Sequence, residues 1–395
     1  MNVKITKAFN IIDKIEKFGG TAYIVGGAVR DSLLGVTVED VDIATSLTPE
    51  EMMKVFPKVI PVGIDHGTVL VRHASDSYEV TTYRTEAGYK DFRHPDEVTF
   101  VRSIEEDLAR RDFTINAMAL NKDLEIIDPF GGREDLNNHE VRAVGEAYKR
   151  FNEDPLRIMR ALRFASQLGF NLHHDTQLAI KEQASLLSKI SVERLAVEFE
   201  KMCEGKEYHY LLQLMKQLKV HIYLPVFKNA PNQIENIPKV KLNGFKELIP
   251  FYCEYASTFT VMDWVKDWKL SNQVKRNSLQ LKSAVDSYKY KPIQSVLYDL
   301  PFNLIESFGN VLNALGLKVD PAEFKAVYEG LPIHSRRELN FQAFDLFHIF
   351  PLSQKGPWIG EYLYEIEHAV ATGQIPNEKS AIKEWIKSWS RPETD

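Results

Sequence analysis

The sequence has little cysteine and no long apolar run. Its two cysteines, Cys203 and Cys253, lie far apart and form no CxxC pair with histidines at metal-ligand spacing, so neither a disulfide framework nor a zinc site is expected. No window approaches the roughly 18 uncharged apolar residues of a membrane span, and the first thirty residues lack a charged segment followed by an apolar one. We therefore expect a cytoplasmic protein with no membrane association.

Excess positive charge is also lacking, since the 395 residues carry a formal net charge of −6 at pH 7. Any contact with nucleic acid must then come from local basic patches. Internal repeats, low-complexity tracts and the GxGxxG dinucleotide fingerprint are absent, and nothing indicates an obligate protein partner. With 44% hydrophobic residues, a chain of this length can bury two to four compact units.

Strand-like segments, rich in β-branched and aromatic residues, are confined to the first part of the chain. They cover residues 21–25, 41–45, 59–62, 68–72, 78–83 and 98–101. From about residue 148 onward, apolar residues recur at helical spacing instead. We predict an α+β N-terminal domain, with a small mixed sheet and helices, followed by all-α domains. Breaks in the pattern suggest the segments 1–146, 147–210, 211–320 and 321–395.

A glycine pair follows the first predicted strand. Gly26 and Gly27 form a turn before a short helix that starts at Ala28, so backbone N–H groups there can approach phosphate oxygens, and Arg30 adds a positive charge one turn later. A glycine pair is more often a plain turn. By itself this feature is weak evidence for a phosphate site.

Two carboxylates come next. Asp40 and Asp42 are two residues apart on a predicted strand and therefore point to the same face. Crowded carboxylates are unfavourable unless divalent cations neutralise them. A solvated edge strand is the alternative, but Val41 and Ile43 point the other way, as a buried inner face requires. The combination favours a Mg²⁺ site at Asp40 and Asp42.

This order of a glycine turn and a carboxylate strand is the arrangement of the polymerase-beta-type nucleotidyltransferases, in which two metal ions activate a 3′-hydroxyl and stabilise the pyrophosphate leaving group. Further motifs follow in order: GGAVRD (26–31), DVDIATS (40–46), RRDFTINA (110–117), DPFGG (128–132), EDPLR (153–157) and SVERL (191–195). Together they resemble the motifs of bacterial class II CCA-adding enzymes. KGPWIG (355–360) and IPNE (375–378) look like that family's tail, so the resemblance covers nearly the whole chain.

The resemblance implies an elongated, multidomain tRNA nucleotidyltransferase. It would add C, C and A to the 3′ end of tRNA from CTP and ATP, with Mg²⁺ as cofactor and protein side chains selecting the base. The four segments would be a catalytic head (1–146), a nucleotide-selecting neck (147–210), a body (211–320) and a tRNA-binding tail (321–395).

Individual roles follow from matching motif positions. Gly27 and Arg30 match the triphosphate-binding turn, Asp40 and Asp42 the catalytic metal ligands, and Arg111 a contact to the sugar and phosphates of the nucleotide. The roles of Arg110 and Asp112 stay open. Glu79, on a strand that could pair beside the two aspartates, is a candidate third catalytic carboxylate; the alternative is an ordinary solvated glutamate.

Residues 152–169 are predicted to form one helix, in which Asp154, Arg157, Arg160 and Arg163 recur every three residues. Such a stripe is usually a solvated face. Cytosine and adenine, however, both present an amine donor beside a ring-nitrogen acceptor, so one carboxylate and one guanidinium suit both bases. The resemblance assigns this selection to Asp154 and Arg157, and further nucleotide contacts to Arg160 and Arg163.

Two further segments allow alternative interpretations. Residues 84–96 are predicted as a long loop beside the active site; in the resembled family a loop here helps to reshape the pocket from C to A, and CC-adding relatives have a shorter one. Trp264 and Trp268 alternate with Lys266 and Lys269, which suits either RNA contact or an amphipathic helix.

Three other functions remain open from the sequence. A bacterial poly(A) polymerase shares the catalytic motifs but tends to be more basic, and a partial CC-adding enzyme would have a shortened loop. An inactive RNA-binding scaffold would have no use for two facing carboxylates.

Overall fold

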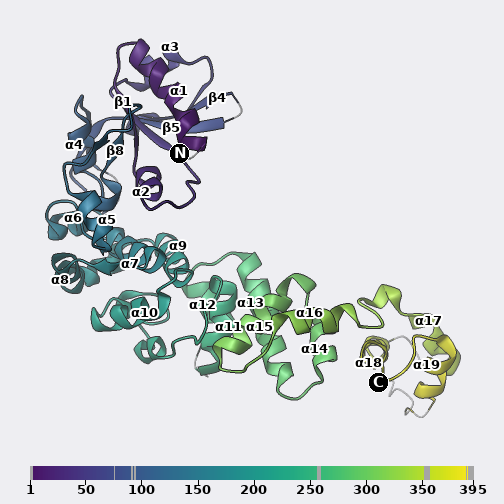
Figure 1. Cartoon of the computed structure of the whole chain (residues 1–395). Helices are drawn as coiled ribbons and strands as arrows, with labels where there is room; N and C mark the ends of the chain where they lie inside the picture. Colours follow the sequence, from purple (N-terminus) through teal and green to yellow (C-terminus); the bar gives the residue numbers. More distant parts are fainter. Residues whose placement is uncertain are drawn as a thin grey trace. The chain divides into compact units, whose positions relative to one another are not determined.

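The computed structural model describes residues 3–74, 76–89, 92, 95–255, 259–350, 356–387 and 389. The chain forms two compact units, Met1–Glu235 and Asn236–Asp395 (Figure 1). Across these described ranges, no helix combines the length and apolar character needed to cross a bilayer.

One seven-stranded mixed sheet organises the first unit, in the order β3-β4-β5-β2-β1-β8-β9. The strands are β1 (Ala22–Val25), β2 (Asp42–Thr45), β3 (Val59–Gly63), β4 (Thr68–His73), β5 (Asp76–Thr82), β8 (Ala119–Leu120) and β9 (Ile126–Ile127). Neighbours are antiparallel except β2 and β5, which are parallel and place Asp42 opposite Glu79. The mixed sheet confirms the predicted α+β class of this part of the chain.

Short helices surround the sheet. They are α1 (Val3–Lys17), α2 (Gly27–Leu33), α3 (Pro49–Val55), α4 (Ile104–Ala109) and α5 (Gly132–Asn137). Helix α1 contacts β1 and buries Ile5, Ala8, Ile12 and Ile15, which recur at the three- and four-residue spacing of one helix face. This packing places α1 against β1, the strand that leads into the glycine turn.

The prediction of a loop over residues 84–96 is partly wrong. Strands β6 (Arg84–Ala87) and β7 (Glu97–Phe100) pair antiparallel as a separate two-stranded sheet. Backbone hydrogen bonds and cross-strand contacts stabilise such an arm without the apolar alternation that marks a buried strand. Lys90, Arg93 and His94 lie outside the described residues, so the role of this stretch in adding the final A stays a prediction.

Five helices follow the sheet in the first unit. They are α6 (Ala147–Glu153), α7 (Leu156–Leu168), α8 (His174–Gln183), α9 (Val192–Cys203) and α10 (Tyr208–Gln217). The predicted single helix over residues 152–169 is wrong, because Asp154 is extended (φ −136°, ψ 98°) and α7 begins only after Pro155. Proline disfavours helical geometry in the preceding residue and lacks an N–H group. Asp154 therefore lies at a joint between two helices.

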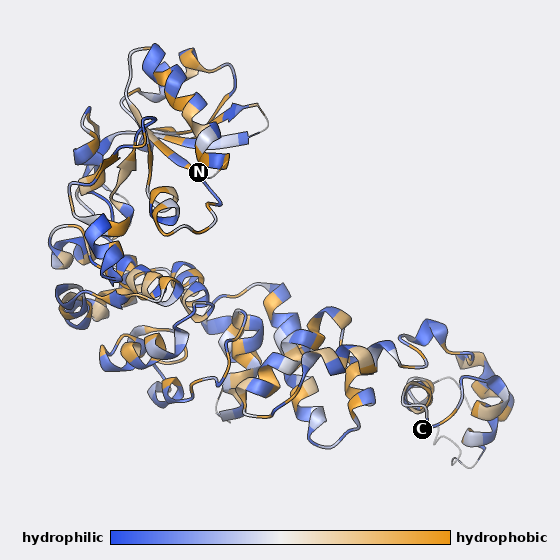
Figure 2. Cartoon of the chain, viewed as in Figure 1, coloured by the Kyte–Doolittle hydropathy of each residue, from blue (hydrophilic) through white to orange (hydrophobic). Residues whose placement is uncertain are grey.

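In the part that the structure describes, the second unit contains helices and no strand. Its α-helices are α11 (Phe245–Tyr255), α12 (Val261–Asp267), α13 (Asn272–Tyr288), α14 (Ile293–Asp299), α15 (Ile305–Ala314), α16 (Pro321–Glu329), α17 (Ala343–Ile349), α18 (Trp358–Ala371) and α19 (Lys379–Ile386). Apolar and polar residues alternate around these ribbons (Figure 2), as in amphipathic helices. Trp264 and Trp268 are 1% and 0% exposed. They are core residues, with no ring face open to an RNA base.

The fully buried Glu247 of α11 predicts a pH-dependent stability. Its Oε2 accepts a hydrogen bond from the Asn243 N–H at 2.8 Å, yet burial raises its pKa above 4.5. The ionised form therefore destabilises the folded state at neutral pH, and this cost fades as the pH falls towards 4.5.

Glu247→Gln removes the free-energy cost of burying an ionised carboxylate and should therefore raise the melting temperature at pH 7. Each ~1 kcal/mol gained in the free energy of unfolding corresponds to about 2–4 °C. The gain should shrink between pH 7 and pH 5 in thermal unfolding followed by circular dichroism. Glu365→Gln, at an exposed position of α18, is the control. A gain that is independent of pH would show that the pKa of Glu247 does not differ between the folded and unfolded states, and would contradict this account.

Candidate functional site

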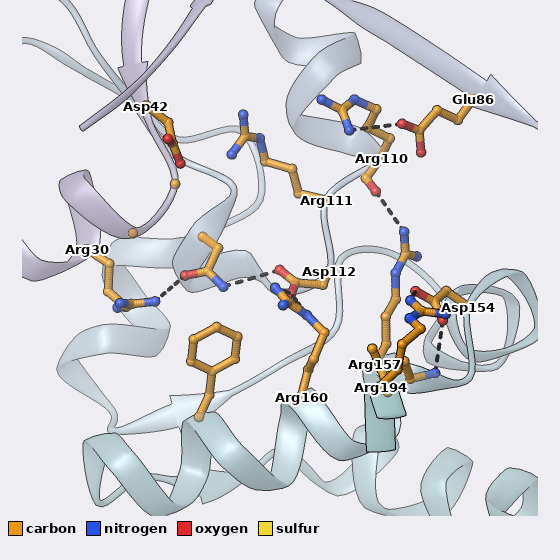
Figure 3. Close-up of a pocket in the computed structure, with 15 residues that line it drawn as sticks. Arg30, Asp42, Glu86, Arg110, Arg111, Asp112, Asp154, Arg157, Arg160 and Arg194 are labelled. Atoms are coloured by element: carbon orange, nitrogen blue, oxygen red, sulfur yellow. Dashed lines mark hydrogen bonds and ion pairs between the residues drawn. The ribbon is translucent and has the colours of Figure 1, made fainter. Parts of the chain in front are cut away.

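A cavity of about 500 Å³ opens in the first unit, between the sheet with its short helices and helices α7 and α9 (Figure 3). Its lining residues are Gly26, Gly27, Arg30, Asp42, Glu86, Arg110, Arg111, Asp112, Asn116, Asp154, Leu156, Arg157, Arg160, Phe164 and Arg194. Six arginines outnumber four acidic residues in this lining, so it favours an anionic ligand. Its volume suits a ligand of nucleotide size.

The glycine turn between β1 and α2 forms one wall. Gly26 has φ 71° and ψ −135°, a conformation that residues with a side chain rarely adopt. A Cβ atom at this position would also lie 3.0 Å from Nη1 of Arg111. Only glycine lets the backbone and the Arg111 guanidinium approach each other here, with Gly27 starting α2 beside them.

Arg30 of α2 is held in place from three sides. Its Nη1 donates to Oδ1 of Asn116 at 2.6 Å, and its Nε donates to Oδ1 of Asp31 at 2.9 Å. Its guanidinium lies 5.1 Å from the centre of the Phe164 ring. The charge of Arg30 is thereby directed into the cavity beside Gly27.

Asp107 orients the two arginines of the RRD motif. This carboxylate of α4 is fully buried and accepts hydrogen bonds from Arg110 at 2.8 Å and from Arg111 at 3.1 Å. Arg110 also donates to Glu86 of β6 at 3.1 Å. The Nε of Arg111 is buried with no hydrogen-bond partner among the described residues. Arg111 therefore retains donor capacity that the protein does not use.

Asp112, whose role the sequence left open, binds Arg160 of α7. Its Oδ2 accepts from Nε of Arg160 at 2.8 Å, and its Oδ1 accepts from Asn116 at 3.2 Å. Burial alone would raise the pKa of Asp112, but the charge and hydrogen bonds of Arg160, with the hydrogen bond from Asn116, outweigh burial and lower that pKa to about 2. Asp112 therefore stays ionised, and Arg160 is fixed beside the cavity.

Asp154 and Arg157 both line the cavity, but each is held by other residues. Asp154 accepts from Arg194 of α9 at 2.8 Å and from the backbone N–H of Leu156 at 3.0 Å. Arg157 donates to Glu153 at 2.9 Å and to the carbonyl oxygen of Arg110 at 3.1 Å. Their polar groups are thus oriented before a ligand arrives.

Three carboxylates gather where β2 begins. Asp42 faces Glu79 across the parallel pair β2 and β5, while Asp40 lies just before β2 and not on it, contrary to the prediction. Burial raises the pKa of Asp42, and the charges of Glu79 and Asp40 add to this effect, against Arg111. A second cavity of about 450 Å³ is lined by all three carboxylates and by Lys4. Asp42 lines both cavities.

These carboxylates are suited to a divalent cation shared with a ligand. Over the described ranges, none of the three accepts a hydrogen bond or forms an ion pair through its side chain. Within the same ranges, no three His, Cys, Asp or Glu side chains converge closely enough to hold a metal ion by themselves. Additional oxygen ligands would have to come from water or from a phosphate.

Arg163 is the one predicted nucleotide contact that lies outside the lining of the first cavity. Its Nε pairs with Glu198 of α9 at 2.6 Å, and its guanidinium stacks 4.1 Å from the centre of the Phe164 ring. A direct contact with a ligand stays a prediction for this residue.

Asn116, Phe164 and Arg194 were not predicted as lining residues, although Asn116 lies in the RRDFTINA motif, Phe164 in the predicted helix 152–169 and Arg194 in the SVERL motif. Residue spacing alone does not reveal which side chains of a motif face a cavity formed by distant segments.

Known sequence families match most of the chain. Residues 22–142 match the profile of the "Poly A polymerase head domain", and residues 169–230 match the "Probable RNA and SrmB- binding site of polymerase A". Residues 251–386 match the second domain of a tRNA nucleotidyltransferase.

Full-length relatives are also similar. The CCA-adding enzyme of Oceanobacillus iheyensis is 41% identical over 96% of each chain, and that of Anoxybacillus flavithermus is 40% identical over 98% of this chain and 97% of its own. The crystal structure of the Bacillus stearothermophilus CCA-adding enzyme in complex with CTP superposes with a TM-score of 0.87 at 38% identity, covering 98% of this chain and 97% of that chain. The Thermotoga maritima CCA-adding enzyme complexed with tRNA shares the fold at 22% identity, with a TM-score of 0.67.

Proposed function

The chain belongs to the CCA-adding enzyme family, and we infer that it adds C, C and A to the 3′ end of tRNA, without a nucleic-acid template, from CTP and ATP with release of pyrophosphate. The observation that carries this function is similarity to CCA-adding enzymes over almost the whole chain, joined to an arginine-lined cavity beside paired carboxylates. Because the substrate is tRNA, we propose that the enzyme works in the cytoplasm.

We propose that the four segments of the chain have the different functions that their motifs suggest. Residues 1–146 would form the catalytic head and 147–210 the neck that selects the nucleotide, since the first cavity takes its lining from both segments. Residues 211–320 would form the body and 321–395 the tRNA-binding tail.

For the catalytic centre, we propose Mg²⁺ held by Asp40 and Asp42, with Glu79 as the third carboxylate. Nucleotidyltransferases of this family use a divalent metal, which lowers the pKa of the attacking 3′-hydroxyl and neutralises the triphosphate. Burial raises the pKa of Asp42, and the charges of Glu79 and Asp40 raise it further; a cation relieves this electrostatic situation.

We propose that the two substrates approach Asp42 from its two sides. The nucleoside triphosphate would occupy the arginine-lined cavity, with its phosphates at Gly27, Arg30 and Arg111. The 3′-terminal nucleoside of tRNA would enter the second cavity, where Glu79 and Asp40 line the wall. Since Asp42 lines both cavities, the attacking hydroxyl and the α-phosphate would meet at this residue.

Base selection would fall to Asp154 and Arg157. Asp154 would accept from the exocyclic amine of C or A, and Arg157 would donate to the adjacent ring nitrogen. Guanine and uracil present a carbonyl and an N–H group in these positions, so donors would face donors and acceptors would face acceptors. Arg194 and Glu153 restrain the selecting pair, which limits its ability to rearrange for a wrong base. Arg160 and Arg163 would support the nucleotide from the next turns of α7.

Asp42→Asn should slow the metal-dependent step that all three additions share. The variant keeps the shape of the side chain but loses the charge that holds the cation, so each addition should slow by about 10²–10³-fold, equivalent to several kcal/mol of transition-state stabilisation. Single-turnover assays on a tRNA that ends before CCA, resolved at single-nucleotide length, would measure this loss. Affinity for the tRNA should change little, and the exposed Asp123→Asn variant is the control. Near-normal addition by Asp42→Asn would contradict the metal assignment.

Asp154→Ala should relax base choice more than it slows CTP incorporation. Removing the carboxylate ends its repulsion of the carbonyl groups of uracil and guanine, so discrimination against UTP should fall about tenfold to a hundredfold, equivalent to ~1–3 kcal/mol. The measurement is the ratio of kcat/KM for CTP to that for UTP. Glu146→Ala, which removes an exposed carboxylate just before α6, is the control. A variant that excludes UTP as strictly as the parent would show that another group selects the base.

A further inference from the structure

Asn116 joins two parts of the nucleotide cavity. It ends the short helix η2 (Thr114–Asn116), is 7% exposed and lines the cavity. Its Oδ1 accepts a hydrogen bond from Nη1 of Arg30 at 2.6 Å, and its Nδ2 donates to Oδ1 of Asp112 at 3.2 Å. One amide group therefore contacts a cation on one side and a carboxylate on the other.

An amide satisfies both neighbours. A carboxylate in this place would accept from Arg30 but repel Asp112, and an aliphatic side chain would remove one partner from each, leaving Arg30 with Asp31 and Asp112 with Arg160 and the Phe113 N–H. Buried polar groups without partners destabilise a site. The chemistry of the two neighbours thus also fixes which way the Asn116 amide points.

Asp112 extends the contact to the next element, since its other oxygen accepts from Arg160 of α7 at 2.8 Å. A continuous chain of hydrogen bonds runs from Arg30 on α2 through Asn116 and Asp112 to Arg160, and Figure 3 shows Arg30, Asp112 and Arg160 along this path. It connects the helix after the glycine turn with the helix that carries Arg157.

Arg30 and Arg160, the two ends of this series of hydrogen bonds, also contact the same aromatic ring. The guanidinium groups of Arg30 and Arg160 lie 5.1 and 5.4 Å from the centre of the Phe164 ring. Like charges on one ring repel each other unless anions lie close by. Asp112 is the anion beside Arg160, and Asp31 is an anion beside Arg30. Asn116 is the group through which Asp112 is linked to Arg30.

We propose that Asn116 is a positioning residue that couples Arg30 to Arg160, so that the site for the triphosphate and the base-selecting helix hold the nucleotide as one unit. The proposal rests on the proposed nucleotide site and adds to it a residue that acts through Arg30 and Asp112. A triphosphate bound at Arg30 would, through Asn116, favour the position of α7 in which Arg157 meets the base.

The test uses the full-length enzyme with Asn116→Asp, which keeps the size of the side chain and the acceptor for Arg30 but replaces the donor to Asp112 with a repelling charge. We expect KM for CTP to rise about tenfold while kcat changes less than about threefold, because the chain of contacts orients the nucleotide and does not touch the reacting atoms. Discrimination against UTP should fall with it. Asn229→Asp, an exposed change in the same unit, is the control.

A double exchange separates coupling from simple damage. Asp112→Asn combined with Asn116→Asp restores one donor and one acceptor between the two positions and leaves an acceptor for Arg160. It gives up the hydrogen bond that the Phe113 N–H donates to Oδ1 of Asp112, so the rescue should be partial. KM for CTP should return towards the parent value, which is non-additive behaviour expected of coupled residues.

Unchanged KM in Asn116→Asp would overturn the proposal. So would a double exchange that is no better than the single variant, or a loss of activity that merely follows a loss of thermal stability. The parent enzyme is assayed for all three additions alongside the variants, so failure of the proposed function would be seen separately as a parent that adds no CCA.

Discussion

The structure depends on holding six guanidinium groups around one cavity. Like charges at this density repel one another, and each is held by an anion or a carbonyl oxygen of the protein. Asp107 holds the RRD arginines, Asp112 holds Arg160, and Asp154 holds Arg194. These contacts create a preformed positive cavity, and the triphosphate would complete its charge balance at little cost in rearrangement.

Much of the fold could be predicted because its main signals are local. The apolar strands of the sheet and the change to helical spacing near residue 148 depend on neighbouring residues alone. Strand β7 overlaps the predicted strand 98–101, but β6 was missed because it is polar and pairs with β7 in a separate two-stranded sheet. The break at Asp154 was also missed, since proline in a first helical turn is common and the spacing of the arginines continued through it. Only the backbone geometry shows that Asp154 precedes the helix.

The residues that line the site were easier to predict than the hydrogen bonds and ion pairs between them. Motif positions identified Arg30, Asp42 and Arg157, and the structure gathers them around one cavity. What could not be predicted is the full set of groups that hold them, because partners such as Asn116 for Arg30 and the Arg110 carbonyl oxygen for Arg157 come from distant segments. The facing positions of Asp42 and Glu79 depend on the register of two parallel strands, and the contacts of Asn116 depend on α2 and Asp112 meeting at η2. Long-range pairings of this kind leave no periodic trace in a sequence.

We propose that one preset pair of side chains recognises both cytosine and adenine, and crystal structures of this enzyme with CTP and with ATP would test this proposal. In both complexes we expect an Asp154 oxygen within about 3.2 Å of the exocyclic amine and an Arg157 nitrogen within the same distance of the adjacent ring nitrogen. A base edge bound by main-chain groups or only by water, with Asp154 and Arg157 still directed at their present partners, would contradict it.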